Sequence, residues 1–385
     1  SEMCIRDSVD ATRFERSLEI LDRAGRRGSK QTQDFRRILD DPAVDALVVA
    51  TNHHWHALPT ILACQAGKDV YVEKPCSHNA WEGRQMIAAA RKYQRVVQVG
   101  LQNRSAAYLQ GARECVQSGR LGELHLVRVL NMNEGQMRPK GPTEPVPATL
   151  DWDMWCGPGP VASYSPGSWR VVRYDYSLGR VFDDGVHQLD VMRLVTGLGP
   201  PRTVSHAGGV FRFKDGRDTP DTMLATFEYP DLTVLFQATL WAEPIRETPS
   251  AIRDGDEFPD WLFNGTKIEL FGTEGMMLVG RMGGGWQAFD NDRKIVASSY
   301  GRHSAAHDAH MADFLDCVRS RRRPHADIEE TFPSTLLAHL ANASYRAGNR
   351  KLEYDPETGG IRDDPEAGAL MRRQGREPWA IPDEV

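Results

Sequence analysis

Short apolar runs alternate with helix-length segments through the first third of the chain, and this alternation constrains the fold most. The apolar runs are Ala46–Ala50, Asp69–Glu73 and Val96–Gly100, and the segments between them, Ala57–Ala66 and Ala80–Tyr93, have the length and composition of helices. Apolar strands that alternate with helices form parallel sheets, because helices cover both faces and each crossover is right-handed. The pattern predicts a doubly wound, Rossmann-type α/β domain.

A different pattern begins after residue 119, where longer β-rich runs replace the alternation. Several of these runs alternate apolar and polar side chains, which is typical of an antiparallel sheet with one covered face. The candidate strands are Glu123–Met132, Thr203–Phe213, Thr222–Tyr229, Leu232–Trp241, Lys267–Phe271 and Met276–Gly280. We therefore expect a dinucleotide-binding domain at 1–119 and an α+β domain with a large, open, mainly antiparallel sheet at 120–385. Helices near His307–Arg319 and Ser334–Arg346 either close the second domain or pack back on the first.

The amino-terminal residues lack the features that normally open a dinucleotide-binding domain, which are a strand and a G-x-G-x-x-G turn. Neither precedes the helical segment that starts at Ala11. Val9–Asp10 resembles the end of a second strand, and the octet Ser1–Ser8 resembles neither a first strand nor a signal peptide. We expect that the chain is truncated at this end and that the octet is a sequencing artefact. Cofactor affinity then collapses, because the turn normally holds the pyrophosphate.

Length and charge exclude several classes of protein. At 385 residues the chain exceeds one ordinary core and suits two domains, and its net charge of −6 provides no basic stripe for nucleic acid. We interpret the basic cluster of Arg319 and Arg321–Arg323 as a solvated helix end. No apolar run approaches the roughly 20 residues of a membrane span. We expect a cytoplasmic protein, or an exported one whose signal was lost with the amino end.

Cysteine and histidine spacings indicate neither a disulfide framework nor a metal site. The six cysteines are scattered without a C-x-x-C pair, as is typical of small buried side chains. The two histidine clusters are His53, His54 and His56, and His303, His307 and His310. The first cluster is too compact to converge on one ion, and the second has no carboxylate or thiolate at matching spacing. We predict no metal site.

Lys74 stands in the tripeptide Glu73-Lys74-Pro75, directly after a predicted parallel strand. Open α/β sheets place their ligands at the carboxyl ends of the strands. Proline restricts its own backbone and that of the preceding residue, so the lysine is held by a stiff segment. An enclosed lysine can donate to an alcohol or carbonyl oxygen, or accept a proton when its pKa is lowered. The alternative is an exposed lysine that ends a strand.

A second group of polar residues is Asp183-Asp184-Gly185-Val186-His187. Asp183 and His187 are four positions apart and share one face of a helix, so the aspartate can orient either the imidazole or a substrate hydroxyl. Histidine suits general acid/base work because its ordinary pKa is about 6.5. The alternatives are that Asp183 or Asp184 is an N-cap and that His187 is a buried structural histidine.

These segments together resemble the glucose-fructose oxidoreductase / inositol dehydrogenase / MocA (Gfo/Idh/MocA) family. The resemblance covers nearly the whole chain, from Val9 to Trp379. The matching segments are Val48–His56, Gly67–Pro75, Gly100–Ser105, Trp152–Pro158 and Asp183-x-x-x-His187. The sequence departs from the family pattern at Asn52, where proline is usual, and in the absence of the glycine motif. The second departure puts the activity of this chain in doubt.

The family resemblance implies hydride transfer between a carbon-bound hydroxyl and NAD or NADP. It implies that Lys74 and His187 handle the proton and that Asp183 positions the hydroxyl. The residues at cofactor-lining positions are Thr51, Asn52, His56, Glu73, Lys74, Gln102 and Asn103. Asp10 is a candidate for the ribose, with an exposed acid after a frayed strand as the alternative. The residues that face nicotinamide or sugar, besides Asp183 and His187, are Trp155, Trp169 and Arg170.

Three functions remain open on the sequence alone. The first is a dehydrogenase of a sugar, inositol or related polyol, which we expect to form a homodimer or homotetramer. The second is an NAD-dependent glycoside hydrolase that oxidises its substrate transiently, eliminates the aglycone and re-reduces the product. The third is a non-catalytic sugar-binding or scaffold protein. Release of an aglycone without accumulation of NADH distinguishes the second from the first, and sugar binding that is indifferent to cofactor distinguishes the third.

Overall fold

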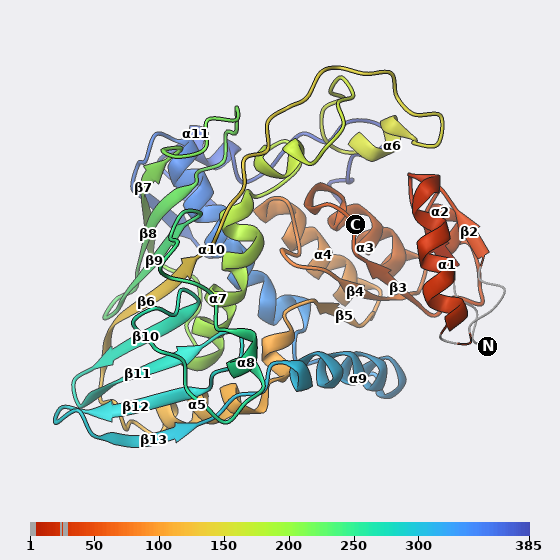
Figure 1. Cartoon of the computed structure of the whole chain (residues 1–385). Coiled ribbons are helices and arrows are strands. Elements are labelled where there is room, and N and C mark those ends of the chain that lie inside the picture. The colour runs from red at the N-terminus through yellow and green to blue at the C-terminus, as the bar shows by residue number, and fades with distance from the viewer. Residues whose placement is uncertain (1–4, 24, 26–29) are drawn as a thin grey trace.

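The amino-terminal part of the molecule consists of short parallel strands and the helices that connect them (Figure 1). The computed structural model describes residues 5–23, 25 and 30–385. The elements of this part are β1 (Ile5–Asp7), η1 (Ala11–Arg13), α1 (Phe14–Arg23), β2 (Lys30–Thr32), α2 (Arg36–Leu39), β3 (Ala46–Val49), η2 (His53–Trp55), α3 (Ala57–Gln65), β4 (Asp69–Val72), α4 (Ala80–Lys92), β5 (Val97–Val99), η3 (Gln102–Ser105) and α5 (Ala107–Gln117). We call it the parallel-strand domain.

The parallel pairing predicted for this domain is confirmed. Strands β3, β4 and β5 form one parallel sheet in that order, and β1 and β2 form a separate parallel pair. Two local predictions are wrong. A strand lies inside the octet, at Ile5–Asp7, and it ends before Val9–Asp10. Asp10 instead accepts a hydrogen bond from the Thr12 backbone N–H and caps η1, because a short carboxylate satisfies a free helical N–H group.

The rest of the chain forms the large-sheet domain. Its elements are β6 (Leu124–Met132), α6 (Trp152–Cys156), η4 (Trp169–Val172), α7 (Arg180–Thr196), β7 (Thr203–Gly209), β8 (Thr222–Glu228), β9 (Thr233–Thr239), α8 (Ser250–Arg253), β10 (Lys267–Gly272), β11 (Gly275–Gly280), β12 (Trp286–Asp290), β13 (Ile295–Ser299), α9 (Ser304–Ser320), α10 (Ile328–Arg346), β14 (Leu352–Asp355), β15 (Gly360–Arg362) and α11 (Pro365–Ala369).

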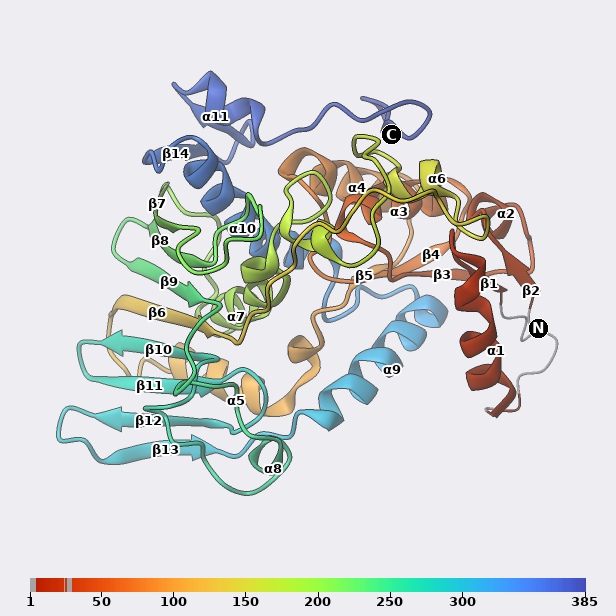
Figure 2. The same ribbon diagram turned by 45° about the horizontal axis from the view of Figure 1, so that its top comes forward.

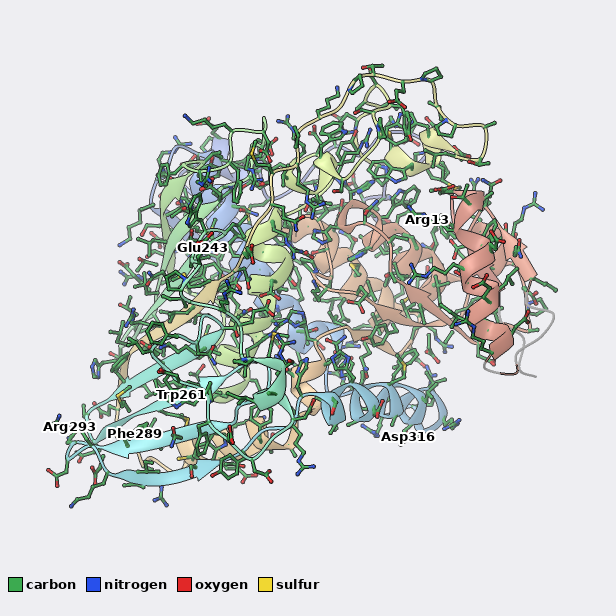
Figure 3. The ribbon with its side chains drawn as sticks, viewed as in Figure 1. Arg13, Glu243, Trp261, Phe289, Arg293 and Asp316 are labelled. Atoms are coloured by element: carbon green, nitrogen blue, oxygen red, sulfur yellow. The ribbon has the colours of Figure 1, made fainter. Side chains whose placement is uncertain are left out.

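Ten strands of this domain form one sheet in the order β13-β12-β11-β10-β6-β9-β8-β7-β14-β15 (Figure 2). β6 and β9 pair in parallel, and the other neighbouring strands whose register is defined pair antiparallel. The large, mainly antiparallel sheet predicted from the sequence is therefore confirmed. The hairpin of β12 and β13 ends at Arg293, at the outer edge of the molecule (Figure 3).

Helices α7 and α10 cover the face of the large sheet that is turned toward the parallel-strand domain (Figure 1). Strand β9 shows why one face is covered, because Val234, Phe236 and Ala238 are buried and the residues between them are partly exposed. Phe236 stacks on Phe182 of α7 with ring centroids 5.3 Å apart. Truncation of such a buried phenylalanine to alanine costs about 3–5 kcal/mol of folding stability. This packing fixes α7, which carries the predicted site residues Asp183 and His187.

The two carboxy-terminal helices also contact the parallel-strand domain. On α9, the His310 Nε2 contacts the Val99 carbonyl at 3.0 Å, and the Gln98 side chain donates to the His310 carbonyl. At the end of α9, Arg321 pairs with Asp69. Helix α10 begins at Ile328, whereas the sequence predicted a start at Ser334. Asp327 caps its first turn, and Pro333 lies within the helix. Because Arg321 pairs with Asp69, the basic cluster at the end of α9 is partly ion-paired, and the interpretation of this cluster as only solvated is wrong.

The five described cysteines are free and buried, which agrees with their interpretation as small core side chains. They are Cys64, Cys76, Cys115, Cys156 and Cys317. Burial raises the pKa of Cys64 to about 12, so this thiol stays protonated at neutral pH. In the described part of the chain, no helix is long and apolar enough to cross a lipid bilayer.

The buried His310 predicts a defined acid sensitivity. Burial lowers its pKa to about 4, and the unfolded chain has the ordinary value of about 6.5. The unfolded state therefore binds a proton first, and folding stability falls as pH drops from 6.5 to 4, by about 3 kcal/mol for this group. The variant His310→Gln keeps a donor toward Val99. Between pH 6.5 and 4, we expect its folding stability to fall by about 3 kcal/mol less than that of the wild type. Urea unfolding at pH 7, 6, 5 and 4 measures the difference, and parallel curves for the two proteins would contradict it.

Candidate active site between the parallel strands and helix α7

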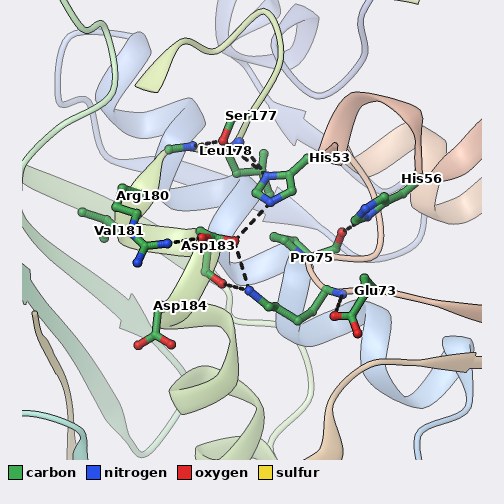
Figure 4. Close-up of polar contacts among 12 residues, drawn as sticks. His53, His56, Glu73, Pro75, Ser177, Leu178, Arg180, Val181, Asp183 and Asp184 are labelled. Carbon is green, nitrogen blue, oxygen red and sulfur yellow. Dashed lines mark hydrogen bonds and ion pairs between the residues drawn. The ribbon is translucent and has the colours of Figure 1, made fainter. Parts of the chain in front are cut away.

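Lys74 follows the carboxyl end of β4 and contacts Asp183 near the start of α7 in the other domain. Figure 4 shows its chain neighbours Glu73 and Pro75 beside Asp183. Its ammonium donates to the Asp183 carbonyl at 2.6 Å and to Asp183 Oδ1 at 3.0 Å. The two residues are separated by 109 positions in the sequence. The structure therefore brings together two of the residues predicted to be catalytic, and the contact crosses the boundary between the domains.

Asp183 is surrounded by three cationic or N–H-bearing side chains. His53 and Lys74 contact Oδ1 at 3.2 and 3.0 Å, and Arg180 contacts Oδ2 at 2.5 Å. Burial by itself would raise the pKa of Asp183, but the hydrogen bond from His53 and the Lys74 charge outweigh it and hold this pKa below its usual range. The residue is a permanent carboxylate at neutral pH. It is not an N-cap, because α7 begins three residues earlier, after Gly179.

The protonation state of His53 follows from its partners. The Leu178 backbone N–H donates to His53 Nδ1 at 3.3 Å, so Nδ1 is an acceptor. A neutral ring then carries its proton on Nε2 and donates it to Asp183 Oδ1. This role of His53 was not predicted from the sequence, where the residue was considered only as a metal ligand. The signal was its place in the loop after β3, beside the loop that holds Lys74.

His187 lies one helical turn after Asp183 on α7, as predicted, but the two side chains are not hydrogen-bonded. Asp183 uses its oxygens for His53, Lys74 and Arg180, and within the described residues no side chain is bonded to the His187 ring. The residue is 7 % exposed, and burial together with the Arg281 and Lys74 charges lowers its pKa well below the ordinary value. His187 is a neutral imidazole at physiological pH and is able to accept a proton.

Asp184 points away from this group and organises a second set of contacts (Figure 4). Its Oδ1 pairs with Arg281 at 3.0 Å, and its Oδ2 accepts from Asn133 and Gln188. Burial would raise the pKa of Asp184, but Arg281 outweighs it and the pKa is about 2. The sequence did not predict Arg281, which follows β11 almost a hundred residues along the chain. Adjacent aspartates thus have separate partners, and both stay charged.

A cavity of about 970 Å³ lies between β3 and the loop that precedes α7. Its lining includes Asp10, Thr51 and Asn52 from the predicted cofactor set, and Trp155 and Arg170 from the predicted substrate set. Residues predicted to bind the cofactor and residues predicted to bind the substrate therefore line the same cavity. Lys74, Asp183 and His187 are not among its lining residues. The nearest link along the chain is His53, which contacts Asp183 and directly follows the lining residue Asn52.

The remaining predicted cofactor residues mainly make structural contacts. His56 is buried between the Pro75 carbonyl, at 2.7 Å, and the Thr51 carbonyl, at 3.0 Å, and it ties the two loops together. The Glu73 carboxylate accepts from the Lys74 backbone N–H, and burial raises the pKa of Glu73. Gln102 donates to the Tyr71 hydroxyl. The buried Asn103 Oδ1 has no partner among the described residues.

The segment Trp155–Gly157 is held against the parallel-strand domain by Trp55. The Trp55 indole N–H donates to the Trp155 carbonyl at 3.2 Å. Gly157 has a positive φ of 49°, and a Cβ there would lie 2.3 Å from the Trp55 ring, so this position requires glycine. Trp155 in turn stacks on Trp152 with centroids 4.8 Å apart. Trp169 is buried beside them on η4.

Three domain models of one family match the chain almost end to end. The model for the oxidoreductase family NAD-binding Rossmann fold matches residues 9–101, and the Gfo/Idh/MocA C-terminal domain model matches 109–278. The model for the oxidoreductase family C-terminal alpha/beta domain matches 274–381. The chain belongs to the Gfo/Idh/MocA family of oxidoreductases. The predicted family and fold class are confirmed.

Curated relatives are dehydrogenases and reductases of low identity. The 1,5-anhydro-D-fructose reductase of Ensifer adhaerens is 27 % identical over 186 residues, which are 47 % of either chain. The myo-inositol 2-dehydrogenase of Thermotoga maritima is 25 % identical over 264 residues, which are 66 % of this chain and 73 % of the relative. The chain thus spans about half the length of the first of these relatives.

Solved structures match over most of the chain. A levoglucosan dehydrogenase in complex with NADH and levoglucosan has a TM-score of 0.66 at 17 % identity, with 91 % of this chain and 89 % of that chain covered. The WlbA dehydrogenase of Bordetella pertussis, in complex with NADH and UDP-GlcNAcA, has a TM-score of 0.64 at 18 % identity, with 92 % and 91 % covered. At this identity the likeness establishes the shared fold.

The carboxylate of Asp183 predicts a pH-dependent contribution to stability. Because its folded pKa is lowered, the contribution is present above the unfolded value of about 4 and is lost as pH falls below it. The variant Asp183→Asn leaves three donors without their acceptor charge. After a discount for its partial exposure, we expect a loss of about 1–3 kcal/mol at pH 7 that narrows below pH 4.

Urea unfolding of the wild type and of Asp183→Asn at pH 7 and pH 3.5 measures this loss. Glu19→Gln is the matched control, because Glu19 forms an exposed ion pair with Arg23 on α1 and its removal changes stability by no more than about 0.5 kcal/mol. Equal stability of Asp183→Asn and the wild type at pH 7 would show that the Lys74–Asp183 contact does not stabilise the fold.

Proposed function

We propose that this protein is an NAD(P)-dependent oxidoreductase that acts on a secondary hydroxyl of a sugar, inositol or related polyol. The observation that carries the proposal is the contact of Lys74, at the carboxyl end of a parallel strand, with Asp183 on α7, with the neutral His187 one turn further along. An ammonium, a fixed carboxylate and a neutral imidazole are the groups that an alcohol oxidation needs for binding the hydroxyl and removing its proton.

The cavity beside this group fits a nicotinamide dinucleotide. Its volume of about 970 Å³ lies at the upper end of the range of cofactor pockets, and Thr51 and Asn52 line it directly after β3. Open parallel sheets bind ligands at this end of their strands. Thr51, Asn52 and Asp10 would hold the cofactor. When bound, the cofactor would supply the hydride acceptor.

The side chains of the site divide the remaining work. Asp183 keeps the Lys74 ammonium in place through two contacts, and the ammonium has a further N–H group for a substrate oxygen. His187 is neutral and unbonded, so it can take a proton from the hydroxyl. Asp183 stays ionised and therefore positions groups rather than carrying the proton. Lys74 and His187 are the proton-handling residues of this proposal.

The relatives support the substrate class. Their names include a myo-inositol 2-dehydrogenase and a levoglucosan dehydrogenase, which act on polyhydroxylated rings. A ring of this kind offers several neighbouring hydroxyls. The polar groups of the site, on β4, α7 and the loop after β3, suit such a ligand because they contain both donors and acceptors.

Removal of the Lys74 ammonium tests the proposal. We expect Lys74→Ala to lower kcat about 100-fold or more, because the group acts on the reacting oxygen, with little change in NADH affinity. NADH titrations of this chain, and of a version with an added strand and glycine-rich turn at its amino end, precede the kinetics. Oxidation of myo-inositol, levoglucosan and simple sugars is then followed by NADH formation.

The control is Lys294→Ala, because Lys294 is exposed in the β12–β13 turn. Lys74→Ala turnover as fast as that of the wild type would refute the catalytic role. Release of an aglycone from a glycoside without accumulation of NADH would show that the reaction is redox-assisted hydrolysis and not net oxidation. Absence of NADH binding in both versions of the chain would refute the proposal that the protein uses a nicotinamide cofactor.

A further inference from the structure

Arg170 is a buried cation inside a box of aromatic rings. The side chain lies on η4, and the residue is 5 % exposed. Its guanidinium carbon lies 4.2 Å from the ring centroid of Trp152, 4.9 Å from that of Trp155 and 4.5 Å from that of Trp169. Indole faces stabilise a cation through their quadrupole, but they do not neutralise its charge.

Within the described part of the chain, no carboxylate contributes to the electrostatics of this guanidinium, and the titratable side chains around it are Tyr176, Cys156 and Tyr164. Burial raises the pKa of Tyr176 and that of Cys156 above their ordinary values, so neither becomes an anion at neutral pH. The nearby Lys140 ammonium, over the Trp169 ring, adds a second positive charge. The local charge is therefore positive and uncompensated.

The hydrogen-bonding capacity of Arg170 is also largely unused. Its Nη1 donates to the Ser165 carbonyl at 3.0 Å. Its Nε and Nη2 are buried and have no acceptor among the described residues. A buried donor without an acceptor is unfavourable, and a buried charge without a partner is more so. Nε and Nη2 lie on one edge of the planar fork, which matches a carboxylate or phosphate in two parallel hydrogen bonds.

Four other arginines of the described chain that are buried or partly buried have partners. Arg104 pairs with Asp190, Arg217 pairs with Asp215 and Arg281 pairs with Asp184. Arg193 has no such ion pair but donates to two carbonyls and to a serine hydroxyl. Within the described residues, Arg170 has no ion pair and two buried donor atoms without an acceptor, so its surroundings do not account for its burial.

Arg170 lines the cavity of about 970 Å³ together with Trp152, Trp155, Tyr164 and Ser165. The acid Asp10 borders the same cavity, but it pairs with Arg13. A ligand in this cavity is therefore the available partner for the guanidinium. Nε and Nη2 are covered in this structure, so a ligand in the cavity binds them only if the Ser165–Arg170 segment or the surrounding indoles shift.

We propose that Arg170 and its surrounding indoles form an oxyanion subsite, which binds a carboxylate or phosphate group of a ligand in this cavity. The inference rests on the proposed function and narrows the choice of ligand. In that function, the anionic group has two possible sources, which are the diphosphate of the dinucleotide and the acidic group of a sugar substrate. Neutral polyols satisfy the hydroxyl-directed groups near Lys74 but leave this cation unpaired.

The test compares the wild type with Arg170→Met, which removes the charge and keeps the length of the side chain. The matched control is Arg173→Met, which makes the same charge change on the same segment but at a residue already paired with Asp218. The probes are inorganic pyrophosphate, NADH, D-glucuronate and D-glucose. Binding is followed by tryptophan fluorescence, because the indoles surround the site, and by calorimetry.

We expect the wild type and Arg173→Met to bind at least one anionic probe, and Arg170→Met to bind it about tenfold or more weakly. We also expect Arg170→Met to be at least as resistant to urea as the wild type in the absence of anions, because an uncompensated buried charge has been removed. A purely structural arginine would instead lower stability and leave anion affinity unchanged.

The pattern of losses identifies the source of the anion. Loss of pyrophosphate and NADH binding with glucuronate unaffected assigns the subsite to the cofactor diphosphate. Loss of glucuronate binding with NADH unaffected assigns it to an acidic substrate. Unchanged affinities in Arg170→Met, or a wild type that binds neither pyrophosphate nor glucuronate, overturn the proposal. None of these readouts uses turnover, so an oxyanion subsite can stand even if the proposed oxidation fails.

Discussion

The contact between Lys74 and Asp183 is the constraint on which the site depends, because its two residues belong to different domains. Lys74 is fixed by the end of β4, and Asp183 is fixed by the packing of α7 on the large sheet. Their distance is therefore set by how the domains sit against each other. Helix α9 holds this arrangement through His310 and Arg321, which contact β5 and β4. The geometry of the candidate site is thus a product of interdomain packing rather than of one local motif.

Charge at the site is arranged by burial and by the separation of two neighbouring carboxylates. Asp183 is held by Lys74 and its neighbours, and Asp184 has a separate partner in Arg281. Both stay ionised, although burial opposes the charged form. The same burial, with the nearby cations, keeps His187 neutral. One helix end therefore presents two fixed negative charges and one uncharged base, and the lowered pKa values of all three groups keep this division at acidic pH as well.

The sequence predicted the parallel strands and the large sheet, because these depend on periodicity, and the family resemblance implied that Lys74 and Asp183 belong to one site. It could not predict contacts that depend on how distant segments meet. His53 reaches Asp183 across the domain boundary, and Arg281 reaches Asp184 from the end of β11. The spacing of Asp183 and His187 allowed a hydrogen bond between them. Spacing along a helix shows that two side chains share a face, but it does not show which other segments supply closer partners. The start of α10 was misplaced because a proline is tolerated inside a helix whose first turn is well capped.

The cavity is bordered by two surfaces that carry polar groups without partners among the described residues. On one side, consecutive residues Ala46–Thr51 line it, so it borders the edge of β3 rather than one of its faces, and Val48 is 57 % exposed there. A strand edge presents backbone N–H and C=O groups. On the other side stands Arg170, a cation among indoles. A ligand that combines anionic oxygens with groups able to bond the backbone would satisfy both sides at once. An apolar ligand would satisfy neither, and a neutral polyol would leave the charge of Arg170 unpaired.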